Sequence, residues 1–543
     1  MARLKESPYG SWKSPITSNL IASDSIELGQ IEVDSDDVYW VEVRPREGGR
    51  SVVVRHTLEG QSFDVTPPSF NVRTRVHEYG GGAFAVANGT IYFSNFADQR
   101  VYCQETQGHP YPITPKGDFR YADGVIDENR DRMVCVREDH SVQGQEPANS
   151  LVSLALERGG AGVVLTEGND FYSSPRISPD GTSLSWLTWN HPNMPWDGSE
   201  LWVSQLKADG FLGRSQIVAG GLNESICQPQ WSPDGVLHFV SDRNGWWNLF
   251  RWKEGQVEAL CEMEAEFGKP QWVFGMVSYA FESAEHIVCT YAQDGCWHLA
   301  SLDTSTSKLE VIESPYTEMS RGAVCTIPGY VIFSGGSSTE PFSVIRLHLA
   351  TGQLNVLRRS SEVVVDESYL SCSRSIEFPT GQGLTAHAFF YPPKNPDYVA
   401  PALEKVPMLV TSHGGPTGAA STSLDLRIQY WTSRGIAVLD VNYGGSSGYG
   451  TEYRRRINGQ WGVVDVDDCV NGALYLVKRG EVDGDRLAIR GSSAGGYTTL
   501  SALTFRDVFK VGASYYGISD LEALAKETHK FEARYLETMI GPY

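Results

Sequence analysis

A serine stands in the middle of five small residues, GSSAG, at positions 491–495. Gly491, Ser493 and Gly495 fit the pattern G-x-S-x-G, which places a serine hydroxyl on a sharp turn between a strand and a helix. The apolar run LAIR precedes this turn, and a helix-like segment follows it. A serine hydroxyl attacks an acyl carbon once a base removes its proton, so the spacing predicts Ser493 as the nucleophile of an acyl transfer.

Acyl transfer also needs hydrogen-bond donors for the negative charge that develops on the attacked oxygen. The backbone N–H of Ala494 is the first candidate, because it opens the helix expected after Ser493. The second is expected in SHGGP (412–416), at the end of another strand-like run, where Gly415 is the donor and Gly414 lets the loop fold. A lone G-x-S-x-G occurs by chance, and the HGGP upstream of it favours a hydrolase.

The segments that carry these motifs alternate between strands and helices. Strand-like runs span 407–416, 435–445, 485–491 and 510–517. One helix between them is predicted from an apolar stripe of five residues: Val466, Val470, Ala473, Leu474 and Val477. Aspartates crowd its first turn and Gly480 follows its last, as the helix dipole and a glycine C-cap favour. The alternation predicts a parallel sheet covered by helices over residues 361–543.

From about residue 31 to about 360, short strand-like runs alternate with Gly, Asp, Asn and Pro turns. SPDG turns begin at Ser178 and Ser232, 54 residues apart, and each stands between two strand-like runs. Repeats of about 40–50 residues built of antiparallel strands predict propeller blades rather than a β-sandwich array. Seven blades are expected, near 31–70, 75–115, 118–166, 170–218, 225–262, 273–313 and 320–358. Residues 1–30 fit neither domain and are expected to pack between the two.

The bulk composition limits the classes of partner and compartment. The chain of 543 residues carries a formal net charge of −21, which disfavours nucleic acid and anionic membrane surfaces as partners. Its nine cysteines form no CxxC pair and are interpreted as reduced thiols. The sequence contains neither the apolar core of a signal peptide nor a run of ~20 apolar residues. A cytoplasmic location is predicted, and a lost organellar extension is left open.

Two further motifs invite binding functions. HEYGGGAF (77–84) has the glycines of a phosphate loop, but it lacks the Lys-Ser/Thr pair and a following helix. A closely packed blade strand is therefore favoured, with Glu78 as a weaker candidate to meet a substrate amino group. Trp246 and Trp247 are interpreted as blade packing rather than as a peptide-binding wall.

Three acidic clusters invite a calcium site, near 34–37, 465–468 and 483–485. None of them has the twelve-residue loop with its terminal glutamate, so they are interpreted as turns and as a helix start. No zinc or nucleotide spacing stands out either. The sequence predicts no metal and no cofactor.

Several stretches together carry a family resemblance: HGGPTG, DVNYGGSSGYG, WGVVDVDDC, RGSSAGGYTTL and YYGISDLEALAKETHKFEARYLETMIGP. They resemble the catalytic domain of the prolyl oligopeptidase family of serine peptidases, in particular the branch of acylaminoacyl peptidases and dipeptidyl-peptidase-like enzymes. VHEYGGGAF, SPRISPDG, LTWNHPNMPWDG and SDRNGWWNLFR resemble the family's seven-bladed propeller. The resemblance implies a β-propeller followed by an α/β-hydrolase domain, which cleaves short peptides while the propeller excludes folded proteins. It carries the nucleophile role to Ser493 and the oxyanion roles to Gly415 and Ala494.

In this family an acid and then a histidine follow the nucleophile. After the nucleophile this chain has one histidine, His529, and two aspartates, Asp507 and Asp520, and none stands where the family places its triad. His413 is favoured as a residue that orients the oxyanion loop, not as the base. We therefore expect the chain to be C-terminally truncated or an incomplete gene product, with strand 510–516 as an exposed apolar edge. This expectation leaves its activity open.

The leading prediction is a serine-type peptidase that hydrolyses short peptides near their N-terminus through an acyl-enzyme on Ser493. The missing acid and histidine favour an alternative, a non-catalytic propeller protein whose hydrolase remnant only supports binding. An esterase with the same chemistry is the third interpretation, which the large propeller disfavours. The sequence leaves open whether the preferred peptide end is acylated or free, and whether the chain forms a homo-oligomer.

Overall fold

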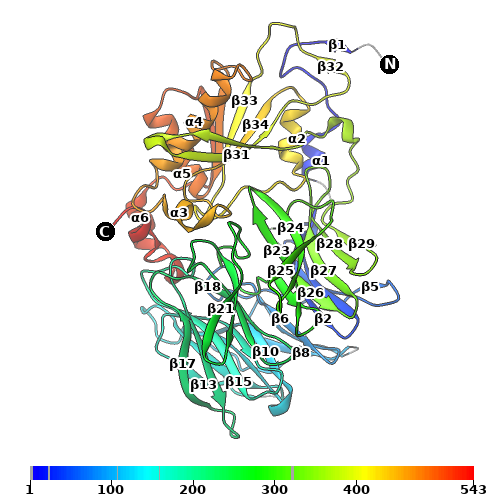
Figure 1. Ribbon diagram of the computed structural model, residues 1–543, viewed down its shortest axis with the longest axis vertical. Coiled ribbons are helices and arrows are strands. Elements are labelled where there is room, and N and C mark those ends of the chain that lie inside the picture. The colour runs from blue at the N-terminus through cyan, green and yellow to red at the C-terminus, as the bar shows by residue number, and fades with distance from the viewer. Residues whose placement is uncertain (1–3, 23–24, 107, 158, 320–322, 543) are drawn as a thin grey trace.

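Two domains are stacked along the long axis of the computed structural model, which describes residues 4–22, 25–106, 108–157, 159–319 and 323–542 (Figure 1). Seven four-stranded sheets form a β-propeller, and a six-stranded sheet with its helices forms an α/β-hydrolase domain. This arrangement confirms the predicted fold class. No helix within the described ranges is both long and apolar enough to cross a membrane.

Each blade is an antiparallel sheet of four strands that follow one another along the chain. The first three blades consist of β2 (Glu27–Asp34), β3 (Asp37–Arg44), β4 (Arg50–His56) and β5 (Ser62–Asp64); β6 (Phe84–Ala87), β7 (Thr90–Ser94), β8 (Val101–Gln104) and β9 (Tyr111–Pro112); and β10 (Phe119–Asp127), β11 (Arg132–Asp139), β12 (Ala148–Ala155) and β13 (Val163–Glu167).

The other four blades consist of β14 (Phe171–Ile177), β15 (Ser183–Trp189), β16 (Glu200–Leu206) and β17 (Leu212–Gly220); β18 (Ile226–Trp231), β19 (Leu237–Ser241), β20 (Asn248–Lys253) and β21 (Gln256–Cys261); β22 (Tyr279–Phe281), β23 (His286–Gln293), β24 (Cys296–Asp303) and β25 (Lys308–Ile312); and β26 (Val324–Ile327), β27 (Tyr330–Gly335), β28 (Ser343–His348) and β29 (Leu354–Arg359). The predicted start of the seventh repeat, at 320–322, lies outside the described residues. The chain also contains short 3-10 helices: η1 (Pro45–Glu47), η2 (Glu128–Arg130), η3 (Glu367–Tyr369), η4 (Gly381–Gly383) and η5 (Lys530–Glu532).

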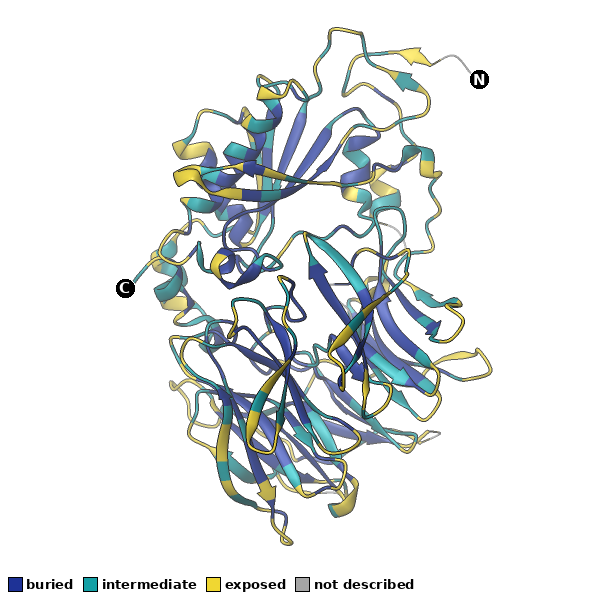
Figure 2. Ribbon diagram, viewed as in Figure 1, coloured by how far each residue is buried: buried dark blue, intermediate teal, exposed yellow. Residues whose placement is uncertain are grey.

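Burial changes systematically across each blade (Figure 2). The second strand of a blade is largely buried, as in β15 and β19, whereas the fourth strand carries few buried residues, as in β13 and β25. Side chains alternate between the two faces of a strand, so an inner strand packs against both neighbouring blades. This position explains why the inner strands are rich in Val, Ile, Leu, Phe and Trp.

The SPDG sequences form the turns between the first and second strands of the fourth and fifth blades. The side-chain oxygen of Ser178 accepts the N–H of Ser183 at 2.9 Å, and the Ser178 hydroxyl donates to Asp180 at 2.6 Å. Gly181 takes a φ of +69°, which residues with a side chain rarely adopt. Ser232 likewise donates to Asp234, and its side-chain oxygen accepts the N–H of Val236, one residue closer than in the first turn. The repeated sequence is therefore a repeated turn, as predicted.

The propeller ring closes by side-chain packing between its first and seventh blades. Apolar residues of both blades form one cluster, which includes Trp40 of β3 and Ile332 of β27. At its edge, Arg358 contacts the carboxylate of Glu42 at 2.8 Å. Each blade consists of consecutive strands, so among the described strands none is exchanged between the two blades that meet here.

The hydrolase sheet has six strands, in the spatial order β30 (Arg374–Pro379), β31 (Thr385–Tyr391), β34 (Ala437–Asn442), β33 (Met408–Ser412), β35 (Leu487–Ser492) and β36 (Val511–Tyr515). The last four run parallel to one another and correspond to the four predicted runs, whereas β31 runs antiparallel to both of its neighbours, β30 and β34. The helices of this domain are α2 (Leu426–Thr432), α3 (Gly450–Arg455), α4 (Val464–Lys478), α5 (Ala494–Phe505), α6 (Leu521–Glu527) and α7 (Tyr535–Met539).

Alternate residues of the parallel strands meet helices on opposite faces of the sheet. On one face Leu439 belongs to the same core cluster as Ala473 of α4. On the other face its neighbour Val438 packs with Ile428 of α2. The sheet is therefore covered on both sides, as parallel sheets require.

Helix α4 confirms the predicted helix, but part of its predicted apolar stripe is wrong. Leu474 is 42% exposed, whereas Cys469 and Leu476 are buried together with Val466 and Ala473. The buried positions follow one another at intervals of three and four residues, which keeps them on one face. The reason for this rotation lies at the start of the helix.

Two buried aspartates anchor the first turn of α4. Asp465 accepts the N–H of Gly462, and Asp468 accepts the N–H of Gly444, each at 2.7 Å. Because both carboxylates face the interior, the residues above them on the same side of the helix are buried as well. Gly480 follows the helix with a φ of +73°, as the predicted glycine C-cap requires.

The first described residues extend the hydrolase domain. β1 (Lys5–Glu6) pairs in parallel with β32 (Tyr398–Val399), and the N–H of Gly10 donates to the carbonyl of Arg434 at 2.9 Å. Helix α1 (Ser18–Ala22) follows, before the chain enters the first blade. Residues 5–10 thus pack on the hydrolase domain, where the backbone of β32 offers a strand partner, whereas residues 27–30 already belong to β2 of the first blade.

A buried cluster of charges joins the two domains at α3. Arg454 donates to Asp242 of the propeller at 2.6 Å, and neither side chain is more than 2% exposed. The same guanidinium lies 3.9 Å from the ring centroid of Trp247, and Glu266 accepts the N–H of Gly450 at 3.0 Å. Burial raises the pKa of both Asp242 and Glu266, which makes the cationic partner important for keeping them ionised.

Strand β36 is the outer strand at one edge of the described sheet. Val511 is 62% exposed, and Tyr516, which follows the strand, is 84% exposed. The predicted apolar edge at 510–516 is confirmed. Such an edge presents free N–H and C=O groups together with apolar side chains, a surface that favours pairing with further polypeptide.

Candidate active site

Ser493 occupies the turn that joins β35 to α5. Its φ of +54° and ψ of −122° form a combination that costs a residue with a side chain about 1–3 kcal/mol. Its N–H donates to the carbonyl of Tyr515 at 3.1 Å, and its own carbonyl accepts the N–H of Gly496 at 2.9 Å. The turn leaves Ser493 exposed to a cavity between the domains.

The glycines of the motif are required by close approaches of the backbone. A Cβ on Gly491 would lie 2.1 Å from the carbonyl oxygen of Gly495, and a Cβ on Gly495 would lie 2.2 Å from that of Ser412. A Cβ on Gly496 would lie 2.6 Å from the Cα of Gly517. All three distances are well below van der Waals contact, so this turn admits no larger residue at these positions.

Two backbone N–H groups near Ser493 are available to a ligand. Ala494 is the first residue of α5, where N–H groups have no intrahelical acceptor. Gly415, in the loop after β33, has a φ of +128° and lines the same cavity as Ser493. Within the described part of the chain, neither N–H has a hydrogen-bond acceptor. The arrangement therefore supports the predicted oxyanion roles of both residues.

His413 holds the loop that carries Gly415. Its Nδ1 lies 2.9 Å from the carbonyl oxygen of Gly414, and its Nε2 lies 2.7 Å from the hydroxyl of Ser446. The bonds assign the proton to Nδ1, which donates to the carbonyl, while Nε2 accepts. A carbonyl and the next N–H point in opposite directions in a trans peptide, so the Gly415 N–H points away from His413. Burial lowers the pKa of His413 to about 4, which keeps the ring neutral.

Neither candidate histidine contacts the hydroxyl of Ser493. Both ring nitrogens of His413 are occupied by the bonds just described. His529 lies with its Nε2 3.5 Å from the carboxylate of Glu532, and its ring meets Tyr79 edge-on. Among the described residues, none forms a hydrogen bond with the Ser493 hydroxyl. The geometry thus supports the orienting role predicted for His413. His529 instead contacts Glu532 and Tyr79.

The cavity at Ser493 has a volume of about 590 Å³ and is built by both domains. Tyr79 and Trp272 line it from the propeller, whereas Trp461, Glu532 and Tyr535 line it from the hydrolase domain. Its size is in the range of pockets that bind small organic ligands. Sequence reasoning missed these five residues, because they come from four separate segments and share no spacing that could have signalled them.

The glycines of HEYGGGAF allow two propeller loops to meet, and they stand before a blade strand rather than in one. β6 begins at Phe84, whereas Gly81 forms an isolated bridge with Phe274. A Cβ on Gly81 would lie 2.5 Å from the Phe274 carbonyl oxygen, and a Cβ on Gly82 would lie 3.0 Å from the Cα of Asp123. The predicted close packing is therefore present. The segment that the glycines approach is the loop at Phe274, which comes from the far side of the propeller ring.

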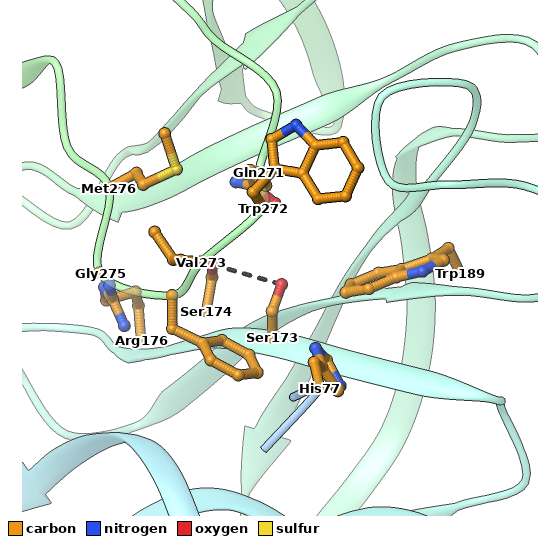
Figure 3. A pocket seen from close by; sticks show the side chains of 11 residues that line it. His77, Ser173, Ser174, Arg176, Trp189, Gln271, Trp272, Val273, Gly275 and Met276 are labelled. Carbon is orange, nitrogen blue, oxygen red and sulfur yellow. Dashed lines mark hydrogen bonds between the residues drawn. The ribbon is translucent and has the colours of Figure 1, made fainter. Parts of the chain in front are cut away.

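A second cavity lies beneath these loops and is much smaller. Figure 3 shows it between the loop 271–276 and strand β14, with Trp272 on one side and His77 on the other. Its volume is about 20 Å³, close to the space that one water requires. Trp272 lines both cavities, so its indole separates the propeller interior from the site at Ser493.

The remaining sequence candidates lie away from the cavity lining. Glu78 is paired with Arg120 at 3.1 Å and with Arg75 at 3.5 Å. Trp247 is buried under Arg454, as described above. Trp246 is the neighbour that packs on Gly450 of α3, since a Cβ on that glycine would lie 3.2 Å from its ring. Both tryptophans therefore pack at the domain interface rather than against the cavity at Ser493.

Comparisons with known proteins agree with this architecture. Residues 422–542 match the model of the prolyl oligopeptidase family. A puromycin hydrolase of known crystal structure is 36% identical in sequence to this chain. The two structures superpose with a TM-score of 0.94 over 99% of this chain and 85% of the hydrolase chain. A puromycin-hydrolyzing peptidase from Mycobacterium tuberculosis is 40% identical, with a TM-score of 0.94 over 99% of this chain and 84% of its own.

A curated relative matches over a shorter segment. Dipeptidyl aminopeptidase BIII from Pseudoxanthomonas mexicana is 36% identical over 135 residues, which are 25% of this chain and 20% of that protein. The match thus spans about a fifth of the curated relative, whereas the similarity to the solved structures extends over both domains.

Proposed function

The chain belongs to the prolyl oligopeptidase family of serine peptidases, and we propose that it hydrolyses short peptides through an acyl-enzyme on Ser493. One observation carries this proposal. The strained turn at Ser493, with a φ of +54°, presents its hydroxyl to a cavity that Gly415 also lines. A purely structural serine has no need of such a turn, because an extended or helical residue would join β35 to α5 without strain.

The proposed reaction begins when the hydroxyl oxygen of Ser493 bonds to the scissile carbonyl carbon and a base takes its proton. The N–H groups of Gly415 and Ala494 donate to the oxyanion, and losing one such donor typically lowers kcat about 10²–10³-fold. The C–N bond then breaks, and the amine leaves with the proton. Water hydrolyses the resulting ester and restores the serine hydroxyl.

We place the proton acceptor outside the described residues. His413 is committed to the oxyanion loop, and His529 is engaged by Glu532 and Tyr79. The exposed apolar edge at β36 offers a surface on which further polypeptide could pair and bring a base to Ser493. The alternative function, a binding protein without catalysis, applies to any form of the chain that lacks such a base.

We propose short substrates because the cavity at Ser493 is enclosed by both domains. Both domains build its walls, and the loops that meet at Gly81 and Phe274 close the propeller end beneath it. A folded protein could not present a loop to Ser493 through these walls. The similarity to a puromycin hydrolase and to a dipeptidyl aminopeptidase supports substrates with an aminoacyl group at one end. We also propose a reducing, cytoplasmic compartment, which the nine free thiols support.

Labelling with a fluorophosphonate tests the proposal. The protein purified from its natural source should react on the tryptic peptide 491–506, and mass spectrometry should place the label on Ser493. Recombinant 1–543 should react roughly 10³–10⁶-fold more slowly if it lacks the base. Ser493→Ala should abolish labelling, whereas the matched control Ser492→Ala should retain it.

Two results would contradict parts of this proposal. Equal labelling of the natural protein and of 1–543 would place the base among the described residues, and His413→Ala and His529→Ala would then identify it. The absence of label on Ser493 in the natural protein would refute the peptidase function and favour the binding protein.

A further inference from the structure

The cavity at Ser493 owes one of its walls to a continuous stretch of chain, residues 528–539, called the wall segment below. Five of its residues line the cavity: Thr528, Glu532, Tyr535, Leu536 and Met539. The candidate nucleophile and the two candidate oxyanion donors lie elsewhere in the chain. The wall segment therefore shapes the space for a substrate without supplying the groups that react, and its position depends on what holds it.

The hydrolase domain holds the wall segment at α7. The N–H of Gly459 donates to the carbonyl of Thr538 at 2.9 Å. The hydroxyl of Tyr535 lies 2.6 Å from that of Thr417, in the loop after β33. These contacts fix α7 to its own domain.

The other end of the wall segment, at η5, reaches the propeller, and Figure 1 shows this part of the chain in red. Nζ of Lys530 donates to the backbone carbonyls of Pro147 and Asp170, each at 2.9 Å, and lies 5.0 Å from the ring centroid of Phe171. Burial lowers the pKa of Lys530, and the carboxylates of Asp170 and Glu146 act against this shift. The propeller thus supplies both the acceptors and the negative charge that a half-buried ammonium group requires.

Phe531 enters an aromatic socket of the propeller and is only 2% exposed. Its ring stacks on that of His77, with 5.3 Å between centroids, and meets the ring of Phe171 edge-on at 5.7 Å. Trp189 and Trp272 complete the socket, at 6.4 and 6.2 Å from the Phe531 centroid. Removing a ring from such a packed site leaves a void that the neighbouring side chains fill only in part.

The hydrogen bonds of η5 show which domain controls it. Among the described residues, the bonds that η5 forms beyond its own segment all go to the propeller. They are the two bonds of Lys530 and one from the hydroxyl of Tyr79 to Glu532, at 2.8 Å. The wall segment therefore bridges the domains, with α7 held by the hydrolase domain and η5 held by the propeller.

We infer that Lys530 and Phe531 are positioning residues, through which the propeller fixes one wall of the cavity at Ser493 and so sets the affinity for substrate. The two side chains are adjacent and both contact Phe171, so they form a single attachment. Without it, η5 would keep only the local bonds of one 3-10 turn, which hold a segment weakly. The residues on either side of the attachment would then leave their places in the cavity wall.

This inference rests on the proposed peptidase function, and it gives the propeller a part in that function beyond enclosing the cavity. Loss of the attachment should weaken substrate binding, because a mobile wall must be ordered each time a ligand binds. It should leave the strained turn at Ser493 in place, since the wall segment takes no part in that turn.

Hydrogen exchange of the chain 1–543, followed by mass spectrometry, tests the attachment without any substrate. Lys530→Met removes the charge and the donors but keeps the length of the side chain. Phe531→Leu removes the ring but keeps an apolar residue. In either variant the amides of 528–540 should exchange at least about tenfold faster, because local opening becomes easier. Exchange in β18 and β33 should stay unchanged, which separates local loosening from a general loss of stability.

Three further variants serve as controls. Lys526 pairs with Glu522 at 2.5 Å within α6, and Phe505 is 69% exposed, so Lys526→Met and Phe505→Leu should not change exchange in the wall segment. Lys530→Arg keeps the charge and the donors, and it should restore slow exchange.

Calorimetric binding in the Ser493→Ala background tests the consequence for substrate, because it needs neither nucleophile nor base. The probe is phenylalanyl-glycine amide or its N-acetyl derivative, whichever binds more tightly to the protein with an unchanged wall segment. Lys530→Met and Phe531→Leu should each weaken this binding at least about tenfold, whereas Lys530→Arg and Lys526→Met should leave it within about threefold.

The two measurements can each overturn the inference. Unchanged exchange of 528–540 in both variants would show that the propeller does not hold this wall. Faster exchange with unchanged affinity would refute the positioning role, as would the absence of binding by both probes at about 1 mM. Failure of Ser493 to be labelled would, in contrast, refute the catalytic proposal and leave these results standing.

Discussion

The indole N–H of Trp272 donates a hydrogen bond to the backbone carbonyl of Thr417 at 2.7 Å, and this bond joins the propeller to the loop that carries Gly415. The hydroxyl of Thr417 in turn lies 2.6 Å from that of Tyr535. The loop of the predicted oxyanion donor is thus held by a propeller residue on one side and by α7 on the other. A change at the domain interface can therefore reach the N–H group of Gly415.

Replacing Trp272 by Phe should loosen this loop while keeping an aromatic ring in place. The substitution leaves the Thr417 carbonyl without its donor, which typically costs about 1–3 kcal/mol. Urea denaturation should show this loss, and the rate of Ser493 labelling in the natural protein should fall. Trp246→Phe is the control, because the indole N–H of Trp246 has no acceptor in the described part of the chain. Equal effects of the two substitutions would contradict a special role of the Trp272 bond.

Removing the charge at Arg454 should destabilise the contact between the domains strongly. Arg454→Met leaves Asp242 and Glu266 buried without a cation, and breaking a buried pair in this way costs about 3–5 kcal/mol. Arg455→Met should cost less than about 1 kcal/mol, because Arg455 donates to backbone carbonyls at the surface. The double variant Arg454→Met, Asp242→Asn should recover part of the loss. A loss below about 1 kcal/mol for Arg454→Met would show that the cluster contributes little.

Asp440 of β34 should make stability fall as the pH rises. Burial raises its pKa to about 7, although Arg490 and Arg427 oppose the shift and Asp425 adds to it. The folded state therefore holds this proton up to about pH 7, whereas an unfolded aspartate releases it near pH 4. The stabilisation that this bound proton gives the folded state is fully present below about pH 4 and is lost between about pH 4 and pH 7. Over that range the free energy of unfolding falls by at most about 1.4 kcal/mol per pH unit.

Asp440→Asn isolates this contribution from those of other groups. The free energy of unfolding, measured by urea denaturation from pH 4 to pH 8, should fall with pH more steeply in the natural sequence than in the variant. Above about pH 7 the difference between the two should stay constant. Parallel curves across the whole range would mean that Asp440 titrates alike in the folded and unfolded chains.

A side chain at Gly81 should disrupt the contact between the two propeller loops. In Gly81→Ala the new Cβ would lie 2.5 Å from the carbonyl oxygen of Phe274, and the φ of +86° disfavours alanine in addition. Gly48→Ala provides a control for the second effect alone, since Gly48 has a φ of +70° and no atom near its Cβ position. We expect Gly48→Ala to cost about 1 kcal/mol and Gly81→Ala clearly more, by thermal or urea unfolding. Equal losses would indicate that the loops move apart freely.

The sequence determined the parts of this protein that depend on neighbouring residues. The turn at Ser493 needs Gly491 and Gly495 within two positions, and the SPDG turns need a serine, an aspartate and a glycine within four. Such requirements leave a readable pattern, because backbone conformation and short-range hydrogen bonds are local. The number of blades and the order of strands and helices followed from the same kind of evidence.

The tertiary structure decided the rest, because it brings together residues that share no spacing. Helix α4 shows this on a small scale: its periodicity was recognised, but buried Asp465 and Asp468 set its rotation and left Leu474 exposed. The cavity shows it on a larger scale, since Tyr79 and Glu532 meet across 453 positions of the chain. Contacts at such separations arise from the packing of one domain on another, which no local pattern records. A candidate nucleophile could thus be proposed from the sequence, whereas the surroundings that would select its substrate required the fold.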